Sequence, residues 1–486
     1  MNQRIRDRLK EKLEERVTFD SQLLDVYDHD IGEIPSIIMS MINCKPEAAV
    51  VVQSNQDVID TLSIASEFGI AVTPRGQGSS GYGGAIPTNG GIVLDMACMN
   101  KIISINKEQH TVDVEPGIIW NNLSFELRKI GLDNSICPTS APSSTVGGWF
   151  PKGGVGLGSM RYGSVRDVVT EIDVIDLDCK VRTYSGSDME IYHQTCGIFG
   201  VIVRLRLKCI KAERIVPYGV LLPNTESVQS FIIKARERLN PYTIILHSSG
   251  YIRMRKQENY DNGNGNQDFH ALIAFEESNK DDITLKSIIN ESGGESLSKE
   301  TAMEEWEDRF YPMRIKKFGP SVLVGEFYLP EKCFDSAWTE IEKDLANDTL
   351  GMEAVVVNDN KMAVLVYILD NAKSMFYQIR MAKALRPLGI ALRYGGSFYT
   401  AGLWLANNSK ELFGMQKYNY IVNTKKERDS KLLLNPGKII PPKIRQIPLL
   451  NICVFMNLIS KLMSPIAKIS IYKNRYKSVL NEKHGE

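Results

Sequence analysis

Two stretches rich in glycine, serine and threonine carry the clearest chemistry in this sequence. The first, 74–84, reads PRGQGSSGYGG and lies between the short, largely apolar runs 70–73 and 92–95. Glycine lets backbone N–H groups approach a ligand closely, and successive inward N–H groups form a concave anion site. Arg75 and the serines add further donors. The composition predicts an anion site with pyrophosphate as its natural occupant; a merely flexible surface loop is the alternative.

The second stretch, 138–148, reads PTSAPSSTVGG and is followed by Gly153-Gly154 and by the tripeptide 161–163, RYG. Two loops of this kind in one unit fit a large, extended nucleotide better than a single phosphate. A Rossmann-type dinucleotide fold does not explain them, because no G-x-G-x-x-G runs directly from a strand into a helix.

Apolar periodicity predicts the elements that carry these loops. A helix over 55–68 is predicted because Val58, Leu62 and Ala65 recur on one face. A helix over 4–16 is densely charged with little apolar face, so it is expected on the surface. Strands are predicted at 48–52, 168–177 and 201–207.

The composition changes near residue 215. From there strands alternate with helices, which predicts an α+β sandwich with helices on one face of a sheet. The predicted strands cover 218–222, 244–246, 271–275, 322–328, 353–357 and 362–369, and the predicted helices cover 227–239, 333–345 and 374–388.

The composition is that of a soluble globular protein and argues against several classes. At 486 residues the chain exceeds one hydrophobic core, so two or more domains are expected. The formal net charge is zero, which provides no basic field for nucleic acid. The cysteines form no C-x-x-C pair, which argues against an iron–sulfur cluster or zinc site within this chain. Because neither a signal peptide nor an apolar run of transmembrane length is found, a cytoplasmic location is expected.

Further motifs accompany the two loops in a fixed order. The stretch 114–117 matches a V-x-P-G turn, 197–202 matches G-T-x-G-I-I, and 435–438 reads N-P-G-K. With the loops and the R-Y-G element, the chain resembles flavoproteins of the vanillyl-alcohol-oxidase and p-cresol-methylhydroxylase type over about residues 25 to 440. Within that superfamily it is most similar to the FAD subunit of glycolate oxidase and to D-lactate dehydrogenases.

The resemblance implies a fold and a cofactor. The fold would be α+β, with an N-terminal helical arm at 1–40, a two-subdomain FAD-binding domain at 41–214, an α+β substrate (cap) domain at 215–440, and a short apolar and basic helical tail at 441–486. FAD is expected to be non-covalent, because Ser79 stands where relatives with tethered FAD place a histidine. The residues implied to bind FAD are Pro74, Arg75, Gly76, Gln77, Gly78, Ser79, Ser80, Gly83, Pro138, Thr139, Ser144, Thr145, Gly147, Gly148, Gly154, Arg161, Tyr162, Val201, Ile202, Asn435 and Lys438.

One departure from the family concerns metal. The glycolate and lactate enzymes of the family bind a divalent metal through H-x-G-D-G-N-x-H and a later E-H-G-x-G. Here the corresponding stretch, 353–362, has no histidine, and Thr400 and Ala401 replace the acid and the histidine of the second motif. We therefore expect no metal site.

Without a metal, a carboxylate substrate would need an arginine, whose planar fork suits it. Arg393 comes just before the altered second motif and is the leading candidate, and Tyr394 and Tyr399 are candidate proton carriers. His270 is a further candidate base. A solvated surface arginine and tyrosines that only pack are the structural alternatives.

Two functions remain open. The first is oxidation of a 2-hydroxy acid such as lactate or glycolate, or of a related alcohol, with electrons passed to an iron–sulfur partner. The second is a flavin-holding electron-transfer or scaffold subunit of a larger complex. In the tail, 448–459 is apolar and is followed by basic residues. Such a segment could lie on the inner face of a membrane, dock on another subunit or fold back on the body. A small-molecule substrate is expected, and no nucleic acid.

Overall fold

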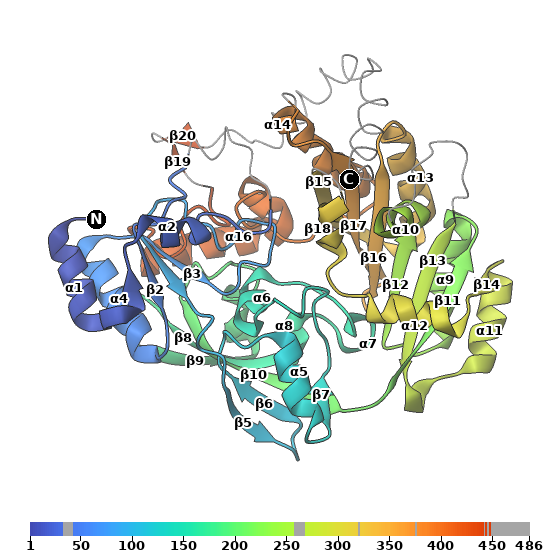
Figure 1. Ribbon diagram of the computed structural model, residues 1–486, viewed down its shortest axis with the longest axis horizontal. Coiled ribbons are helices and arrows are strands. Elements are labelled where there is room, and N and C mark those ends of the chain that lie inside the picture. The colour runs from blue at the N-terminus through green and yellow to red at the C-terminus, as the bar shows by residue number, and fades with distance from the viewer. Residues whose placement is uncertain are drawn as a thin grey trace, which may run out of the picture.

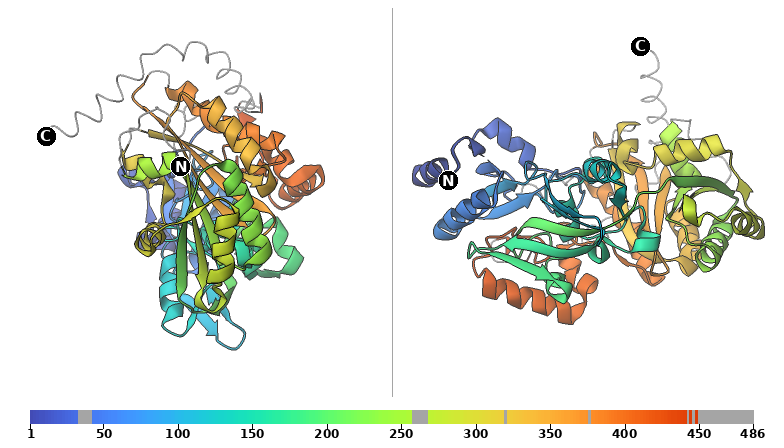
Figure 2. Two further views of the ribbon diagram at one scale, coloured as in Figure 1. Left: turned by 90° about the vertical axis from the view of Figure 1, so that its right-hand side faces the viewer. Right: turned by 90° about the horizontal axis from the view of Figure 1, so that it is seen from below.

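Three sheets and their helices make up the body of the protein in the computed structural model (Figure 1). The structure describes residues 1–32, 42–256, 268–318, 321–374, 377–441, 443–444 and 447–448. Seen from below, the elements of the first half of the chain lie to the left and the eight-stranded sheet of the second half lies to the right (Figure 2). Mixed helix and sheet content confirms the predicted α+β class.

The first sheet has four strands in the order β1-β2-β4-β3, and β2, β4 and β3 are parallel. Their bounds are β1 Val17–Thr18, β2 Ala48–Val51, β4 Ile92–Asp95 and β3 Val72–Arg75. Helix α4 (Asn55–Phe68) begins with a capping box between Ser54 and Asp57 and ends at the left-handed Gly69. The glycine-rich loop leaves the carboxyl end of β3, the edge of a parallel sheet at which ligands bind.

Helix α1 (Gln3–Leu13) lies against α4 and is not a purely surface helix. Ile5, Leu9 and Leu13 recur every fourth residue and are buried in the core of the first sheet. The expectation of little apolar face was wrong, because three well-spaced apolar side chains are enough to bury one stripe of a charged helix.

The second sheet follows the order β5-β6-β10-β8-β9, and β7 also pairs with β10. The strands are β5 Ile102–Asn106, β6 Thr111–Val114, β7 Leu132–Asn134, β8 Val169–Ile175, β9 Val181–Ser185 and β10 Val201–Lys211. Helices α5 (Trp120–Arg128) and α6 (Val146–Lys152) pack through Trp120 and Trp149, whose rings meet edge to face at 5.2 Å between centroids. The second Ser/Gly-rich loop connects β7 to α6.

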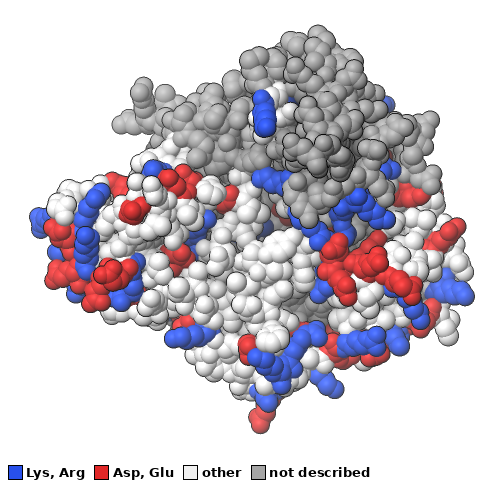
Figure 3. Space-filling model, viewed as in Figure 1, with Lys and Arg blue, Asp and Glu red and all other residues white. Residues whose placement is uncertain are grey.

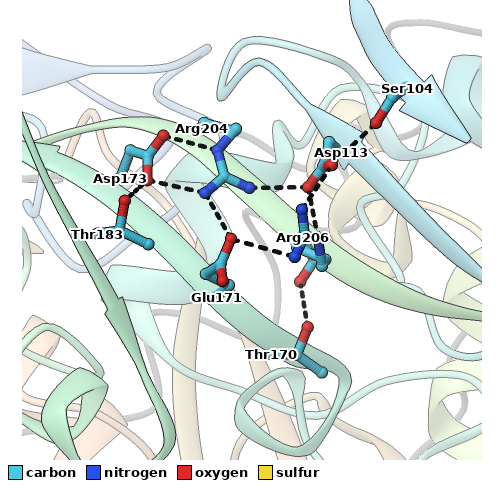
Figure 4. Close-up of polar contacts among 8 residues, drawn as sticks. All are labelled: Ser104, Asp113, Thr170, Glu171, Asp173, Thr183, Arg204 and Arg206. Carbon is cyan, nitrogen blue, oxygen red and sulfur yellow. Dashed lines mark hydrogen bonds and ion pairs between the residues drawn. The ribbon is translucent and has the colours of Figure 1, made fainter.

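One face of this second sheet carries a network of ion pairs (Figure 4). Arg204 bonds Asp173 at 2.6 Å, Glu171 at 2.6 Å and Asp113 at 2.8 Å. Arg206 contacts Asp113 at 2.9 Å. Each carboxylate meets at least one guanidinium, so the charges on this face are paired. Over the molecular surface in Figure 3, Lys and Arg are interspersed with Asp and Glu.

The third sheet has eight strands in the order β14-β11-β13-β12-β16-β17-β15-β18, all antiparallel. The strands are β11 Ile215–Leu222, β12 Thr243–Ser248, β13 Phe269–Glu276, β14 Glu295–Ser296, β15 Ser321–Pro330, β16 Leu350–Val357, β17 Lys361–Asp370 and β18 Ser397–Phe398. These bounds contain all six strands predicted beyond residue 215.

Helices cover both faces of the third sheet. Four of them, α9 Thr225–Arg238, α11 Asp282–Glu291, α13 Phe334–Asp344 and α15 Leu385–Arg393, pack into one large core on one face. Helices α10 (Ser249–Lys256) and α12 (Lys299–Glu307) and the short α7 (Ser159–Tyr162) lie on the other face, toward the first half of the molecule. The prediction of helices on one face only was incomplete, because α10 and α12 carry only short apolar stripes.

The chain returns to its first half after the third sheet. Lys425 of α16 (Ser409–Arg428) donates to the carbonyl oxygen of Ile198 at 2.5 Å, and Leu434 forms a parallel bridge with Val72 of β3. The range 215–440 therefore includes a segment that packs on the first two sheets. The remaining short elements are α2 Ser21–Leu24, α8 Val165–Val168, α14 Tyr377–Arg380, β19 Lys443–Ile444 and β20 Ile447–Pro448. The predicted tail otherwise lies outside the described residues.

Candidate active site

A cleft lies where the three sheets meet, and both Ser/Gly-rich loops line it. The space inside it that is free of protein atoms, its open mouth included, measures about 1240 Å³. Fifteen of the residues predicted to bind the cofactor line it: Pro74, Arg75, Gly76, Gln77, Gly78, Ser79, Ser80, Pro138, Thr139, Ser144, Thr145, Gly147, Gly148, Val201 and Ile202. The structure thus gathers segments more than 100 residues apart around one space.

The first loop presents unused hydrogen-bond donors to the cleft. The backbone N–H groups of 76–80 donate to no other group within the described residues. The buried Ser80 hydroxyl has no partner there either. Buried polar groups are nearly always satisfied, so this loop fits a ligand with several acceptor oxygens, as a diphosphate has.

The Arg75 side chain stabilises the loop through contacts with its backbone and with residues earlier in the chain. Its guanidinium donates to the carbonyl oxygen of His29 at 2.7 Å, and burial lowers its pKa. Gly78 has φ +63°, and a Cβ there would lie 2.4 Å from this guanidinium, so only glycine fits. Arg75 therefore fixes the shape of the loop as well as adding positive charge to it.

Asp30 is a buried carboxylate in the wall of the same cleft. It accepts hydrogen bonds from the backbone N–H groups of Gly32 at 2.8 Å and Gly83 at 2.7 Å. Burial raises the pKa of Asp30 to about 6, although these two hydrogen bonds act to lower it. No motif in the sequence points to it.

The second loop meets the first at close range. Thr145 caps α6 by accepting from the Gly148 N–H at 3.2 Å. A Cβ on Gly76 would lie 2.3 Å from the Thr145 hydroxyl, and one on Gly147 would lie 2.3 Å from Pro116. These glycines are thus required by contact between segments, which explains their positions in both motifs.

The other predicted cofactor residues, Gly83, Gly154, Arg161, Tyr162, Asn435 and Lys438, do not line the cleft. The backbone N–H of Gly83 donates to the Asp30 carboxylate. A Cβ on Gly154 would lie 2.5 Å from the Tyr399 hydroxyl. Arg161 and Tyr162 both bond Glu276 at the end of β13. Helix α7 is therefore joined to the third sheet by these two side chains, and they are unavailable to a ligand in the cleft.

The N-P-G-K segment at 435–438 contacts the first loop and the residues that follow it, and Asn435 and Lys438 do not line the cleft. Asn435 donates to the carbonyl oxygens of Gly84 at 2.9 Å and Cys196 at 2.6 Å. Lys438 is almost fully buried and donates to the carbonyl oxygen of Ile86 at 2.6 Å. Burial lowers the pKa of Lys438 to about 8.

The three predicted catalytic residues lie in two different places in the structure. Tyr399 lines the cleft, and its hydroxyl bonds the backbone of Val155. Arg393 and Tyr394 instead lie on the surface, where both contact Glu340 of α13. The structure does not place Arg393 and Tyr394 at the cleft, because α15 packs against α13 on the sheet face that points away from it.

A cluster that the sequence analysis missed lies where β15 meets the cleft. The carboxylate of Glu326 is hydrogen-bonded by the Tyr82 hydroxyl. The Lys152 ammonium lies 5.4 Å from the centre of the Tyr82 ring and 4.7 Å from that of Tyr399. The ring of Tyr328 lies 5.1 Å from that of Tyr399. An acid, a cation and three aromatic rings thus surround one end of the space.

The protonation of Glu326 is set by opposing effects. Burial raises its pKa, while Lys152 and the Tyr82 hydrogen bond act in the other direction without cancelling it. A signal for this residue was present: Glu326 is the one charged residue in the ten of β15. Within the described ranges, no three His, Cys, Asp or Glu side chains converge as metal ligands.

Comparison with known proteins identifies the cofactor. Residues 46–185 match the family described as the FAD binding domain. The chain carries a FAD-binding domain. The matched range covers both glycine-rich loops and strands β2 to β9, and the unused N–H groups of the first loop fit the diphosphate of FAD.

The curated relatives are flavoenzymes matched over part of their length. The chain is 34% identical over 130 residues to glycolate oxidase subunit GlcD of Bacillus subtilis, covering 27% of this chain and 28% of that one. It is 28% identical over 241 residues to D-lactate dehydrogenase of Anaerostipes hadrus, covering 47% and 49%. The chain therefore spans half or less of these relatives in the matched regions.

A solved structure extends the likeness to most of the fold. p-Cresol methylhydroxylase with substrate bound superimposes with a TM-score of 0.74 at 16% identity, covering 91% of this chain and 98% of that one. This similarity establishes the fold, including the third sheet. The predicted FAD-binding domain followed by a second α+β domain is confirmed.

Proposed function

We propose that this protein is a FAD-dependent oxidoreductase that oxidises a hydroxyl-bearing carbon of a small molecule, a 2-hydroxy acid of the lactate or glycolate kind or a related alcohol. The observation that carries the proposal is the placement of Glu326, Lys152 and Tyr82 in the FAD cleft. Oxidation of an alcohol requires a proton acceptor and a group that orients the substrate, and this cluster offers both.

Each residue has a role in this proposal. FAD, when bound, supplies the two-electron acceptor. Glu326 takes the hydroxyl proton, because a raised pKa makes a carboxylate a better base. Lys152 attracts the acid group of the substrate, and the rings of Tyr82 and Tyr399 restrict water around it. Glu326, Lys152 and the tyrosines all come from this chain.

Anaerobic reduction tests the proposal. The FAD-loaded protein is mixed with a panel of 2-hydroxy acids and simple alcohols, and bleaching of the flavin absorbance is followed. Bleaching by at least one member is expected. If no member bleaches the flavin while dithionite does, oxidation of these substrates is excluded and the alternative, a flavin-holding electron-transfer or scaffold subunit, is favoured.

The cofactor is proposed to be non-covalent. Ser79 lines the cleft, and a serine hydroxyl is a poor nucleophile toward flavin. Acid precipitation of the holoprotein should release all of the flavin into the supernatant. Flavin that stays with the precipitate would contradict this.

The electron acceptor is proposed to be an iron–sulfur protein, as the resemblance of the sequence to the glycolate oxidase FAD subunit implies. Flavin reduced by substrate should then be reoxidised at least about ten-fold faster by an oxidised ferredoxin of matched reduction potential than by dissolved oxygen. Equal rates would contradict an iron–sulfur partner.

The location is proposed to be cytoplasmic, with contact to the inner face of the membrane through the tail at 441–486. The basic and apolar composition of the tail supports this contact. None of the helices in the described ranges is long and apolar enough to cross a bilayer. Fractionation of the full chain against a variant ending at residue 440 tests the contact; identical membrane-bound fractions would refute it.

A further inference from the structure

A row of ionisable side chains crosses the third sheet from the cleft outward. Glu326 of β15 lies opposite Leu365 of β17, and Leu365 lies opposite Glu353 of β16. Glu353 lies opposite His247 of β12, which lies opposite His270 of β13. Side chains directly opposed on antiparallel strands point to the same face. Four ionisable groups, Glu326 among them, therefore share one face of the sheet, and this face borders the cleft through Glu326. The five strands that carry the row lie side by side in Figure 1.

Tyr367 lies beside the one apolar position in this row. It follows Leu365 by two residues, so it points to the same face of β17. It is fully buried, and its hydroxyl has no hydrogen-bond partner in the described part of the chain. Burial and then the charges of Glu353, Tyr251 and Glu326 raise its pKa. The Tyr367 hydroxyl is thus within electrostatic reach of both carboxylates.

The outer part of the row consists of two histidine–carboxylate pairs. His247 Nε2 lies 3.2 Å from Glu353 Oε2, and both side chains are almost fully buried. His270 Nδ1 lies 2.7 Å from an oxygen of Glu305 of α12. Burial acts to raise the pKa of Glu305, but the hydrogen bond from His270 and the charges of His247, His270 and Arg255 outweigh it and leave the pKa low.

Four of the groups in and beside the row have an unused polar atom. His247 Nδ1, Glu353 Oε1 and Glu305 Oε2 are buried and, like the Tyr367 hydroxyl, bond nothing among the residues described. In an ion pair that served only to stabilise the fold, every buried polar atom would be expected to have a hydrogen-bond partner, since buried unpaired polar atoms destabilise a fold. Several neighbouring unpaired atoms are instead typical of a chain of groups bridged by ordered water.

The row reaches solvent at its far end. The side chain of His270 is 19% exposed, whereas that of His247 is 1% exposed. The charged and titratable groups that face the row from α10 and the segment after α12 are Tyr251, Arg255, Asp308 and Arg314. Arg255 and Arg314 are both paired with Asp308, so these side chains are engaged with one another rather than with the row.

We propose that this row conducts the substrate-derived proton from Glu326 to solvent, through the Tyr367 hydroxyl, Glu353 and His247 and then Glu305 and His270. The inference rests on the proposed function. Each transfer breaks one O–H or N–H bond as the next forms, so one proton enters at Glu326 and one leaves at His270. FAD, when bound, would supply the acceptor for the hydride and its electron pair. Tyr367, Glu353 and His247 act through Glu326 and do not touch the substrate.

Single-turnover kinetics test the route. The FAD-loaded protein is mixed with a substrate that bleaches the flavin in weak buffer, and a pH-indicator dye reports proton release alongside the flavin absorbance. In the wild-type protein the two signals should coincide. In Tyr367→Phe, and in Glu353→Gln, bleaching should stay within about two-fold of the wild-type rate while proton release lags it by about ten-fold or more.

A matched control lies in the same aromatic stack. The Tyr251 ring stacks on Tyr367 at 5.4 Å, but its hydroxyl donates to the carbonyl oxygen of Pro312 at 3.4 Å, away from the row. Tyr251→Phe removes the same group from the same core and should release protons in step with bleaching. Proton release that keeps pace with bleaching in Tyr367→Phe would overturn the proposal.

A second measurement does not depend on a substrate. A high-resolution crystal structure of the FAD-loaded protein should show direct or water-bridged hydrogen bonds that link Glu326, Tyr367 and Glu353. A dry gap between Glu326 and Glu353 would overturn the route even if the protein is an oxidoreductase. Conversely, a bridged row in a protein whose flavin no substrate bleaches would contradict the proposed function, and the row would then have no substrate-derived proton to conduct.

Discussion

Two sheets of this protein each carry a cluster of charged side chains, and the two clusters are built in opposite ways. On the second sheet, Arg204 and Arg206 pair with three carboxylates, and the Arg204 side chain is 17% exposed. On the third sheet, Glu353 and His247 are at most 2% exposed, and each leaves one polar atom unpaired. The first cluster is partly exposed and all of its carboxylates are paired, whereas the second is buried and only partly paired.

The difference separates a stabilising cluster from a reactive one. A guanidinium that bonds several carboxylates has little left to offer a ligand or a proton. An unpaired buried atom has a free-energy cost that packing must offset, and such costs concentrate at functional sites. Variants of the two clusters should therefore fail in different assays.

The largest effect is expected from Glu326→Gln. The amide keeps the shape of the side chain but accepts no proton, so flavin reduction by substrate should slow by about 10²–10⁴-fold. FAD content, measured from the ratio of flavin to protein absorbance, should be unchanged. Rapid-mixing absorbance spectroscopy measures the rate.

Glu342 provides a matched control for Glu326. It is another glutamate whose pKa burial raises, but it lies on α13, on the face of the sheet away from the cleft. Glu342→Gln should reduce flavin at the wild-type rate. If Glu326→Gln and Glu342→Gln behave alike, Glu326 is not the proton acceptor.

Arg204→Met should reduce the free energy of unfolding by about 1–3 kcal/mol at neutral pH, because it leaves partly buried carboxylates with fewer partners. Flavin reduction should be unaffected. Despite burial, which acts to raise them, hydrogen bonds from the arginines lower the pKa values of Asp113 and Asp173. The wild-type stability they provide is present above the unfolded pKa of about 3.9 and is lost as the pH falls below it.

Urea denaturation at pH 7 and pH 3 measures this difference. The gap in stability between wild type and Arg204→Met should be larger at pH 7. Arg182→Met, which removes a more exposed pair with Asp178, serves as the comparison and should change stability by about 0–1 kcal/mol. Equal losses in the two variants would remove the distinction between the network and an ordinary surface pair.

Binding of FAD should weaken as the pH rises, by up to about ten-fold for each unit by which FAD shifts the pKa of Asp30. Burial already raises that pKa to about 6, and the negative diphosphate should raise it further, so binding favours the protonated form. Affinity is therefore greatest below pH 6 and falls above it. Fluorescence titration of apoprotein with FAD from pH 5.5 to 7.5 measures this, and Asp30→Asn should flatten the profile. An affinity that rises with pH would refute the role of Asp30.

The smallest effect is expected from Arg393→Ala. The Arg393 side chain is 58% exposed and pairs with Glu340 on the surface, so flavin reduction should change by less than about two-fold and stability by less than about 1 kcal/mol. Steady-state kinetics and thermal unfolding measure both. A loss of substrate affinity of ten-fold or more would restore the sequence-based assignment of Arg393.

The cofactor loops could be predicted from the sequence because their requirements are local. The spacing of Gly76 and Gly78 reflects how closely the backbone passes Thr145 and Arg75, and such spacing is visible in a few residues. The strands of the third sheet were predictable for the same reason, since alternation and apolar runs are local patterns.

The proton chemistry could not be predicted in this way, because it depends on which face of an element meets the cleft. Arg393 lies beside a motif of the family, yet α15 turns it toward α13. Glu326 lies in no motif, and only the pairing of β15 with β17 aligns it with Glu353. Register across strands that are far apart in the sequence is a property of the whole sheet.

The return of residues 433–439 to the first sheet has a consequence for biosynthesis. The bond from Lys438 to Ile86 spans 352 positions of the chain, and at about 5–20 residues per second a ribosome needs roughly 20–70 s to add that many. During that time the nascent first domain lacks the support that Asn435 and Lys438 give to its glycine-rich loop. Capture of FAD is therefore expected to be a late event, completed only after the ribosome has added residues 435–438.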